Sequence, residues 1–377
     1  MSHVTRSRCR RVAFASALLP LLARLVTTAG AQPHATMSGR ELYVAACANC
    51  HASDGRGASR PQVGFPEPLP DFTDCAAASR EAAQDWQTIV ARGGPARSFA
   101  HRMPAFGDAL SADQIARVVD YLRSLCHDRR WPRGELNLPR PIATEKAFPE
   151  DEVVVTGSAV SRPGARATDA ALIYERRIGA GSQWELEIPV GTRERASGRM
   201  TPVQLGDLTA ALKHTLYHAA DHGTILSGYA EVVLPTGSAA ADLGAGTTVV
   251  EPGLLFAQTL GPAAFLHAQA GLGVPVDARR AEREALWRAA LGTTLQHGGG
   301  RSWSPMIELL GARELAPGAR SEWDAIPQMQ VSLSRRQHVR ASVGVRLPLG
   351  ERDARPRELL GYLNWDWFDG GLFDGWR

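Results

Sequence analysis

The sequence lacks several features that would indicate a common class of protein. Beyond residue 31 there is no apolar run of about 18 residues, so we expect no transmembrane helix in the mature chain. The formal net charge is only +3 and gives no indication of a nucleic-acid partner. No Ser–His–Asp set, glycine-rich phosphate loop or zinc motif stands out, so no enzyme class is indicated. Cysteine is scarce, with five residues among 377, which makes the position of each informative.

The N-terminus has the pattern of an export signal. Four arginines precede a short apolar core at 12–22, and Ala29-Gly30-Ala31 is a cleavage sequence of the A-x-A type. We expect residues 1–31 to be a signal peptide that uses the ordinary secretory route, with a twin-arginine route at Arg10-Arg11 as the alternative. Export places the remaining four cysteines in an oxidising compartment.

Cys47-Ala48-Asn49-Cys50-His51 is the attachment pattern of a c-type haem. The two thiols attach to the haem vinyl groups, and the imidazole of His51 is expected to take one axial position on iron. Half of a zinc site and a redox dithiol are the alternatives for a Cys-x-x-Cys pair. The sequence has no second such pair to complete a zinc site, and no βαβ pattern surrounds this one.

The second axial ligand is expected to be Met103. It lies in a loop, directly before Pro104, which rigidifies the chain. A thioether opposite an imidazole favours ferrous haem and raises the potential. His101 is the rival ligand, and core packing is the ordinary role of a lone methionine.

Two capping boxes mark the ends of this helical region. Ser38 and Glu41 predict a helix that leads into Cys47, and Ser111 and Gln114 predict an amphipathic helix that runs to Leu125. A third helix is predicted over 81–92, where it ends at Gly93-Gly94.

Residues 38–126 resemble a class I monohaem cytochrome c, through the N-terminal helix, Cys-x-x-Cys-His, Met-Pro loop and C-terminal helix in that order. The resemblance implies an all-α domain with one covalent haem c, which we place at 32–130. Cys75 and Cys126 are not part of the family pattern. We expect them to form a disulfide, with two free buried thiols as the alternative.

A stretch without periodicity follows. Residues 131–151 contain Pro132, Pro139, Pro141 and Pro149, together with several charged residues. This composition predicts an extended linker.

From residue 152 to 377 the hydrophobic pattern has a period of two. Apolar residues alternate with polar ones at 266–274, 327–333 and 339–347, which predicts strands with one apolar face. The strands are often about ten to thirteen residues long, as a tilted membrane strand requires. Short turns near 179–182, 219–223, 261–262, 298–302 and 335–337 alternate with long loops near 191–206, 235–247, 275–284, 316–322 and 350–356.

This rhythm is typical of outer-membrane barrels, whose periplasmic turns are short. Counting back from a last strand at 357–368 gives a first strand at 152–160 and an antiparallel transmembrane β-barrel of about twelve strands. The region resembles the barrel family named after phenol-degradation pathways, partly through Leu234-Pro235-Thr236-Gly237. A soluble β-sandwich is the alternative fold. Polar residues expected to line the lumen, without a specific ligand, are Glu185, Glu187, His214, His218, Glu231, His267 and Gln269.

The sequence therefore predicts a multidomain chain whose first domain is an electron-transfer haem protein rather than an enzyme. The cytochrome domain is expected in the periplasm, with the barrel in the outer membrane. The expected partners are a periplasmic redox protein and membrane lipid. One alternative is an outer-membrane channel for small apolar or aromatic compounds with an accessory haem, for which a small-molecule solute would be a further partner. Another is a haem-based sensor or enzyme in which Met103 dissociates from iron.

Overall fold

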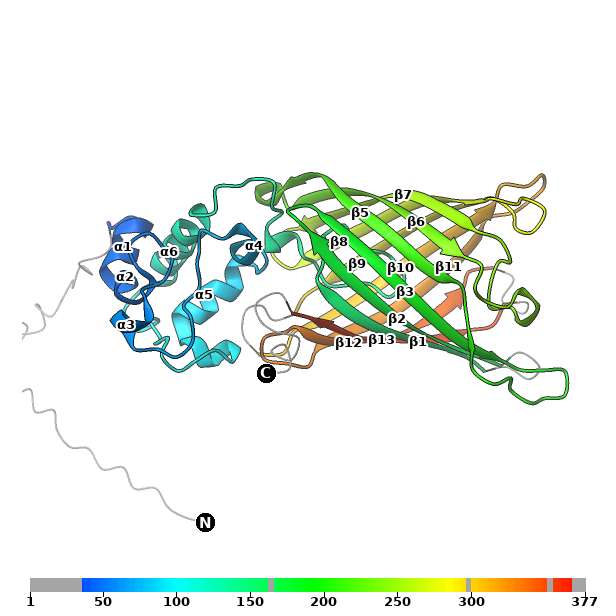
Figure 1. Cartoon of the computed structure of the whole chain (residues 1–377), viewed down its shortest axis with the longest axis horizontal. Helices are drawn as coiled ribbons and strands as arrows, with labels where there is room; N and C mark the ends of the chain where they lie inside the picture. The colour runs from blue at the N-terminus through cyan, green and yellow to red at the C-terminus, as the bar shows by residue number, and fades with distance from the viewer. Residues whose placement is uncertain (1–35, 162–165, 296–299, 351–354, 368–377) are drawn as a thin grey trace, which may run out of the picture. The chain divides into compact units, whose positions relative to one another are not determined.

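The computed structural model describes residues 36–161, 166–295, 300–350 and 355–367 (Figure 1). The predicted signal peptide at 1–31 lies outside the described residues. The described chain consists of a helical region followed by a β-barrel. None of its helices is both long enough and apolar enough to span a bilayer.

The helical region contains six α-helices and two 3₁₀ turns within the described residues. They are α1 (Gly39–Ala46), α2 (Ala48–His51), α3 (Arg60–Val63), α4 (Cys75–Ala78), α5 (Ala83–Arg92), η1 (Gly94–Arg97), α6 (Ala112–Ser124) and η2 (Gly134–Leu136). Both predicted capping boxes are present, at Ser38 with Glu41 and at Ser111 with Gln114. The predicted helix at 81–92 is confirmed as α5, which begins two residues later.

The core of this region is the crossing of α1 and α6. Val118 and Val119 of α6 are fully buried, and so is Tyr43 of α1. The rings of Tyr43 and Tyr121 lie 5.3 Å apart. A Cβ on Gly39 would overlap the carbonyl oxygen of Arg117, so the close approach of the two helices requires glycine at this position.

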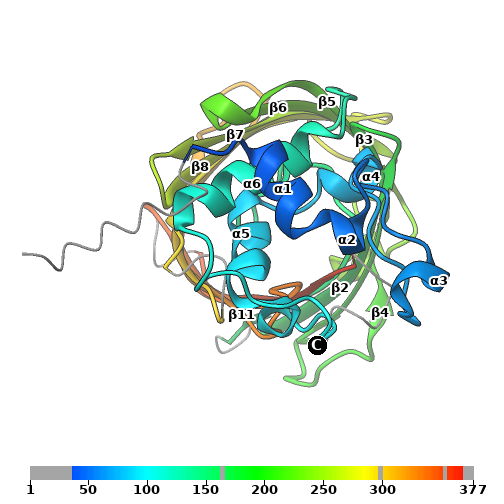
Figure 2. The same ribbon diagram turned by 90° about the vertical axis from the view of Figure 1, so that its left-hand side faces the viewer.

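The second region is a closed antiparallel barrel of twelve long strands, as predicted (Figure 2). The strands are β1 (Glu152–Val160), β2 (Ala167–Ile178), β3 (Ser182–Arg193), β5 (Leu208–Ala219), β6 (Thr224–Leu234), β7 (Val249–Leu260), β8 (Ala264–Pro275), β9 (Glu284–Thr293), β10 (Trp303–Glu314), β11 (Glu322–Ser332), β12 (Val339–Pro348) and β13 (Glu358–Asp366). A two-residue strand, β4 (Gln204–Leu205), pairs beside β3. Strands β1 and β13 pair and close the barrel, which rules out the sandwich.

The burial pattern of the strands is the reverse of that in a soluble sheet. Along β8, Leu272 and Val274 are 46% and 39% exposed, whereas His267 is 1% exposed. Leucine and valine side chains are also exposed on the other strands, with Leu254 51% and Val343 55% exposed. An apolar outer face with a polar interior is what a barrel in lipid requires.

The connections also follow the predicted rhythm. Short connections join β2 to β3, β5 to β6 and β7 to β8, while the loops from β3 to β5 and from β6 to β7 are much longer. The connection from β9 to β10 departs from this rhythm, because it is longer than the loop from β8 to β9. The predicted turn at 298–302 and the loop at 350–356 lie partly outside the described residues. Because β1 starts and β13 ends at the edge of the short turns, both ends of the barrel chain lie at that edge.

Aromatic side chains gather at both edges of the barrel. At the short-turn edge, the rings of Tyr174 and Trp184 are 5.2 Å apart, and Trp367 is 5.9 Å from Tyr174. At the long-loop edge, Trp287 and Trp323 are 5.5 Å apart. Two such girdles mark the interfaces of a membrane-spanning barrel.

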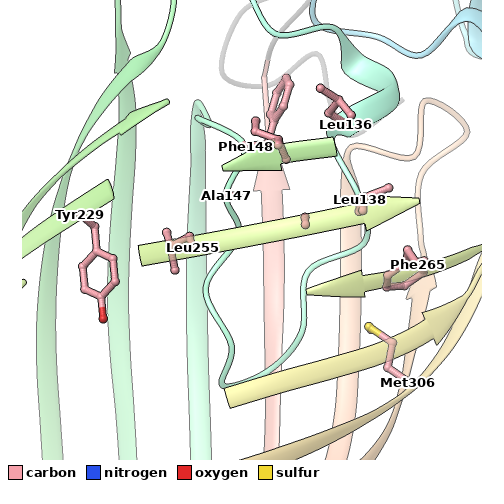
Figure 3. Close-up of a cluster of buried hydrophobic side chains, with 10 residues drawn as sticks. Leu136, Leu138, Ala147, Phe148, Tyr229, Leu255, Phe265 and Met306 are labelled. Atoms are coloured by element: carbon pink, nitrogen blue, oxygen red, sulfur yellow. The ribbon is translucent and has the colours of Figure 1, made fainter. Parts of the chain in front are cut away.

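Residues 133–151 are called the lumen segment below, and its residues 136–150 lie inside the barrel. Leu136, Leu138, Ala147 and Phe148 share a buried apolar cluster with side chains from the strands (Figure 3). The segment contains no α-helix or β-strand, as its composition predicts, but its position in the lumen has no signal in that composition.

The lumen prediction was wrong for His214. Its ring lies on the exposed outer face of β5, where Nδ1 is 2.8 Å from the hydroxyl of Ser182. A bulge between Thr215 and Tyr217 reverses the alternation of β5, so residues four apart lie on opposite faces. His218 pairs with the inward-facing Ile225, which places it on the lumen side.

Candidate haem-binding site

The Cys-x-x-Cys-His motif lies where α1 passes into α2. Cys47 caps the C-terminus of α1, and Cys50 and His51 occupy the last turn of α2. Both cysteines are free thiols, with Cys47 buried and Cys50 partly buried. The motif therefore presents two thiols and an imidazole within one short helical segment.

Contacts from α1 and from two glycines hold the end of this motif. The hydroxyl of Tyr43 donates to the carbonyl of Ala52 at 2.6 Å and lies 3.0 Å from the carbonyl of His51. Ala52 has φ 59°, a conformation that L-residues rarely adopt. Gly55 and Gly57 also have positive φ, which glycine adopts readily in the tight turn that follows the motif.

The imidazole of His51 lies in an apolar environment. Its ring is 5.1 Å from Phe72, which is 5.4 Å from Trp86 of α5. Burial lowers the pKa of His51, which favours the neutral imidazole that can bind iron. Burial also raises the pKa of the Cys47 thiol to about 11.

Met103 lies in the loop between η1 and α6, against the C-terminal end of α5. Its carbonyl accepts a hydrogen bond from the Gly94 N–H at 3.0 Å. A Cβ on Gly93 would lie 2.9 Å from the same carbonyl, so the glycine pair allows the loop to approach the helix. Met103 is partly buried whereas His101 is exposed, as expected if Met103 is the ligand.

A disulfide joins Cys75, the first residue of α4, to Cys126, which follows α6. The two Cα atoms are 5.0 Å apart, and the closed loop spans 51 positions. Met103 lies within that loop. The disulfide therefore limits the freedom of the segment that carries the expected second ligand.

The residues present fit a covalent haem. The Nδ1 atom of His51 is buried and has no hydrogen-bond partner in the described part of the chain. Cys47 and Cys50 stay unpaired in a region that contains a disulfide elsewhere. Two thiols, one imidazole and one thioether are the donors that a c-type haem uses.

A comparison with protein-family models identifies the helical region. Residues 34–122 match the model of the family described as "Cytochrome C oxidase, cbb3-type, subunit III". No curated protein matches the chain. Residues 34–122 therefore form a cytochrome c domain, which is followed by the closed barrel of twelve strands.

Solved structures similar to the chain include outer-membrane channels. An outer membrane channel from Pseudomonas putida F1 is 13% identical, with a TM-score of 0.42, over 61% of this chain and 100% of that chain. The NanC porin is 10% identical, with a TM-score of 0.39, over 57% of this chain and 99% of that chain. The KdgM porin is 9% identical, with a TM-score of 0.37, over 57% of this chain and 99% of that chain.

Sequence reasoning missed two contributors to this site. Gly93 and Gly94 were interpreted from the sequence only as the end of a helix. In the structure they also allow the loop that carries Met103 to approach α5. Tyr43 was not singled out from the sequence, but its hydroxyl donates to the Ala52 carbonyl and holds the end of the haem motif. The glycine pair was visible in the sequence, but its partner is ten residues away and follows only from the fold.

Proposed function

We propose that this protein is a haem c electron carrier anchored to the outer membrane by its barrel, with the cytochrome domain in the periplasm. The free thiols of Cys47 and Cys50 beside the imidazole of His51, whose Nδ1 has no hydrogen-bond partner in the described part of the chain, carry this proposal within a cytochrome c domain. Residues 1–31 would be the export signal, 32–130 the cytochrome domain, 131–151 the linking segment and 152–377 the barrel.

The chain's own residues would hold one haem. The thiols of Cys47 and Cys50 would each add across a vinyl double bond, which forms a C–S bond without a leaving group. The imidazole of His51 and the thioether of Met103 would take the two axial positions. When bound, haem c supplies one-electron transfer between ferric and ferrous iron.

Two filled axial positions favour electron transfer over chemistry at iron. The Tyr43 hydroxyl and the apolar contact with Phe72 hold the His51 side in place, and the Gly94–Met103 hydrogen bond holds the other loop. Little movement of ligands on changing oxidation state is what rapid electron transfer requires. We therefore expect a periplasmic redox protein to be the partner, and we expect no catalytic turnover.

The topology of the barrel supports this proposed orientation. Short turns of outer-membrane barrels face the periplasm. Strand β1 begins at that edge, so the residues that precede it enter from the periplasmic side. This is the compartment in which haem c is proposed to act.

The first experiment is membrane fractionation of the full-length protein, with haem staining and heat-dependent gel mobility. We expect covalent haem in the outer-membrane fraction and a mobility shift on boiling, because a folded barrel migrates differently from the unfolded chain. Haem in the soluble fraction without a shift would overturn the anchoring role. Loss of covalent haem is expected for Cys50→Ala, while Cys126→Ala serves as the control that keeps it.

The identity of the second ligand is tested separately. Met103→Ala is expected to abolish the thioether-to-iron absorption band of the ferric protein and to allow carbon monoxide to bind. His101→Ala is the matched control and should leave the band intact. The reverse pattern would assign the ligand to His101, and CO binding by the unaltered protein would favour the sensor or enzyme alternative.

A further inference from the structure

The lumen segment is packed as tightly as a protein core, although it contains three prolines, Pro139, Pro141 and Pro149, and no regular strand. Lys146, Ala147, Phe148 and Glu150 are at most 1% exposed. A solvated linker would leave such residues accessible. The barrel wall therefore covers a folded part of the chain.

Contacts between the lumen segment and the wall surround the segment. Arg140 pairs with Glu152 of β1 and Glu175 of β2, each at 2.6 Å. Further strands also hydrogen-bond to the segment. Side chains of the wall lie within hydrogen-bond distance of backbone carbonyls of the segment: Lys213 of β5 (Lys146), Ser227 of β6 (Ala147), His267 of β8 (Pro139), Arg288 of β9 (Ala143), and both Gln330 of β11 and Tyr362 of β13 (Arg140). The side-chain oxygens of Gln183 of β3 and Gln269 of β8 accept the backbone N–H groups of Glu150 and Glu145.

The segment folds as two arms that pair with each other. The Nζ of Lys146 donates to Oδ1 of Asn137 at 2.5 Å and also pairs with Glu150. Leu138 and Phe148, from opposite arms, belong to one apolar cluster with Leu255 of β7 (Figure 3). Paired arms give the segment a defined shape, unlike a flexible tether.

The tip between the two arms, residues 142–144, is held by one carboxylate. Glu308 of β10, itself fully buried, accepts the backbone N–H groups of Ile142, Ala143 and Thr144 at 2.8, 3.0 and 2.7 Å. The Thr144 hydroxyl donates to it as well, at 2.6 Å. Hydrogen bonds to an ionised acceptor are roughly twice as strong as neutral ones.

Beside Glu145 little space remains between the segment and the wall, whereas a cavity of about 340 Å³ lies between Asn137–Pro139 and the wall residues Phe265 and Gln330. The cavity lined by Glu145 of the segment and by Lys213, Tyr229 and Glu231 of the wall has a volume of about 10 Å³. That is the limit for a single water molecule. Solutes larger than water cannot pass through it.

We propose that the lumen segment is a built-in plug that closes the barrel to solutes, and that Glu308 is the residue that retains its tip. Side chains fill a barrel of about eight strands, whereas barrels of about 16 strands leave a channel. A twelve-stranded barrel is between these sizes and needs additional filling, which the segment supplies. The proposal concerns the barrel alone and does not depend on the haem.

The test is solute permeability of liposomes that contain the full-length protein. Three further proteins are compared with it: residues 136–149 replaced by glycine and serine of equal length, Glu308→Gln, and the control Glu187→Gln. Glu187 also faces the lumen, from β3, and it makes no hydrogen bond to the lumen segment among the described residues. Heat-dependent mobility confirms that each barrel is folded before permeability is measured.

The unaltered protein and Glu187→Gln should be impermeable to small sugars. The replacement should increase the swelling rate by on the order of tenfold or more, because a flexible coil does not stay packed in the lumen. Glu308→Gln should give an intermediate rate. The amide keeps one acceptor oxygen, but its NH₂ group replaces the second oxygen and is a donor that cannot accept the backbone N–H groups it faces.

Swelling by the unaltered protein as fast as by the replacement would overturn the proposal. So would a folded replacement that stays impermeable. If the replacement does not fold, the unaltered protein and Glu308→Gln decide the question, because a folded Glu308→Gln barrel that stays impermeable removes the retaining role. None of these outcomes alters the haem-staining result, so failure here is distinct from failure of the proposed function.

Discussion

The disulfide between Cys75 and Cys126 gives a prediction whose size follows from the structure. It closes a loop of 51 positions that contains Met103. In the chain-entropy model, a loop of this length restricts the denatured state by about 4 kcal/mol at 25 °C. Measured values for native disulfides are typically about 2–4 kcal/mol, because native strain and residual denatured structure reduce the effect.

Replacement of both cysteines with alanine should therefore destabilise the cytochrome domain while the barrel stays folded. For a domain of this size, a loss of about 2–4 kcal/mol lowers the unfolding midpoint by roughly 10–20 °C. The loop that carries Met103 gains the most freedom in the double variant. The thioether-to-iron band of the variant should therefore disappear on heating at a temperature below the Soret transition of the unaltered protein.

The assay is thermal unfolding of the full-length protein in detergent, followed through haem absorbance. Two controls accompany it: the unaltered protein after mild reduction, which should match the double variant, and thiol labelling under denaturing conditions without reduction, which should modify neither cysteine. Labelling of both residues, or a midpoint within a few degrees of the unaltered protein, would refute the reasoning.

Three further predictions concern single positions. Gly39→Ala should destabilise the cytochrome domain by about 1–3 kcal/mol, because the added methyl group overlaps a backbone oxygen of α6. Thermal unfolding followed by haem absorbance measures this loss, and Val44→Ala, at an exposed position of α1, is the control that should leave the midpoint nearly unchanged. Tyr43→Phe should cost about 1–3 kcal/mol by leaving the carbonyls at the end of α2 without their donor, and an unchanged denaturation midpoint would contradict that role. Leu254→Arg, on the outer face of β7, should destabilise the barrel in lipid by about 2–4 kcal/mol, as measured by urea unfolding in vesicles, whereas Val276→Arg in a long loop should be near neutral.

Local patterns were enough to predict most of the architecture. The capping boxes at Ser38 and Ser111 predict the starts of α1 and α6, because a cap depends on residues only three positions apart. The first barrel strand was predicted at 152–160 and is β1, because alternation and loop length are properties of contiguous sequence. The haem motif is likewise contiguous, so its residues could be named without a fold.

The opposite faces of His214 and His218 show how alternation fails when a strand contains a bulge between the two residues. One extra residue between Thr215 and Tyr217 shifts the register, and no local composition signals it. The reversed burial of the barrel is a related case. The polar residues expected in the lumen could be predicted only together with the barrel, because in a soluble sandwich the same alternation would place the apolar face inside, and the pairing of β1 with β13 decides for the barrel.

The order of the two regions, the haem motif and a count of about twelve strands could be predicted from the amino-acid pattern, because each depends on neighbouring residues or on a repeat along the chain. The position of residues 133–151 could not, and it is known from the folded chain alone. The prolines and charges of these residues are equally compatible with a solvated linker and with a packed segment. Which of the two forms depends on hydrogen-bond partners more than a hundred residues away, such as Glu308, which accepts the N–H of Thr144. A buried polar segment is stable only where the surrounding wall satisfies its hydrogen bonds, and that wall exists only once the barrel has closed.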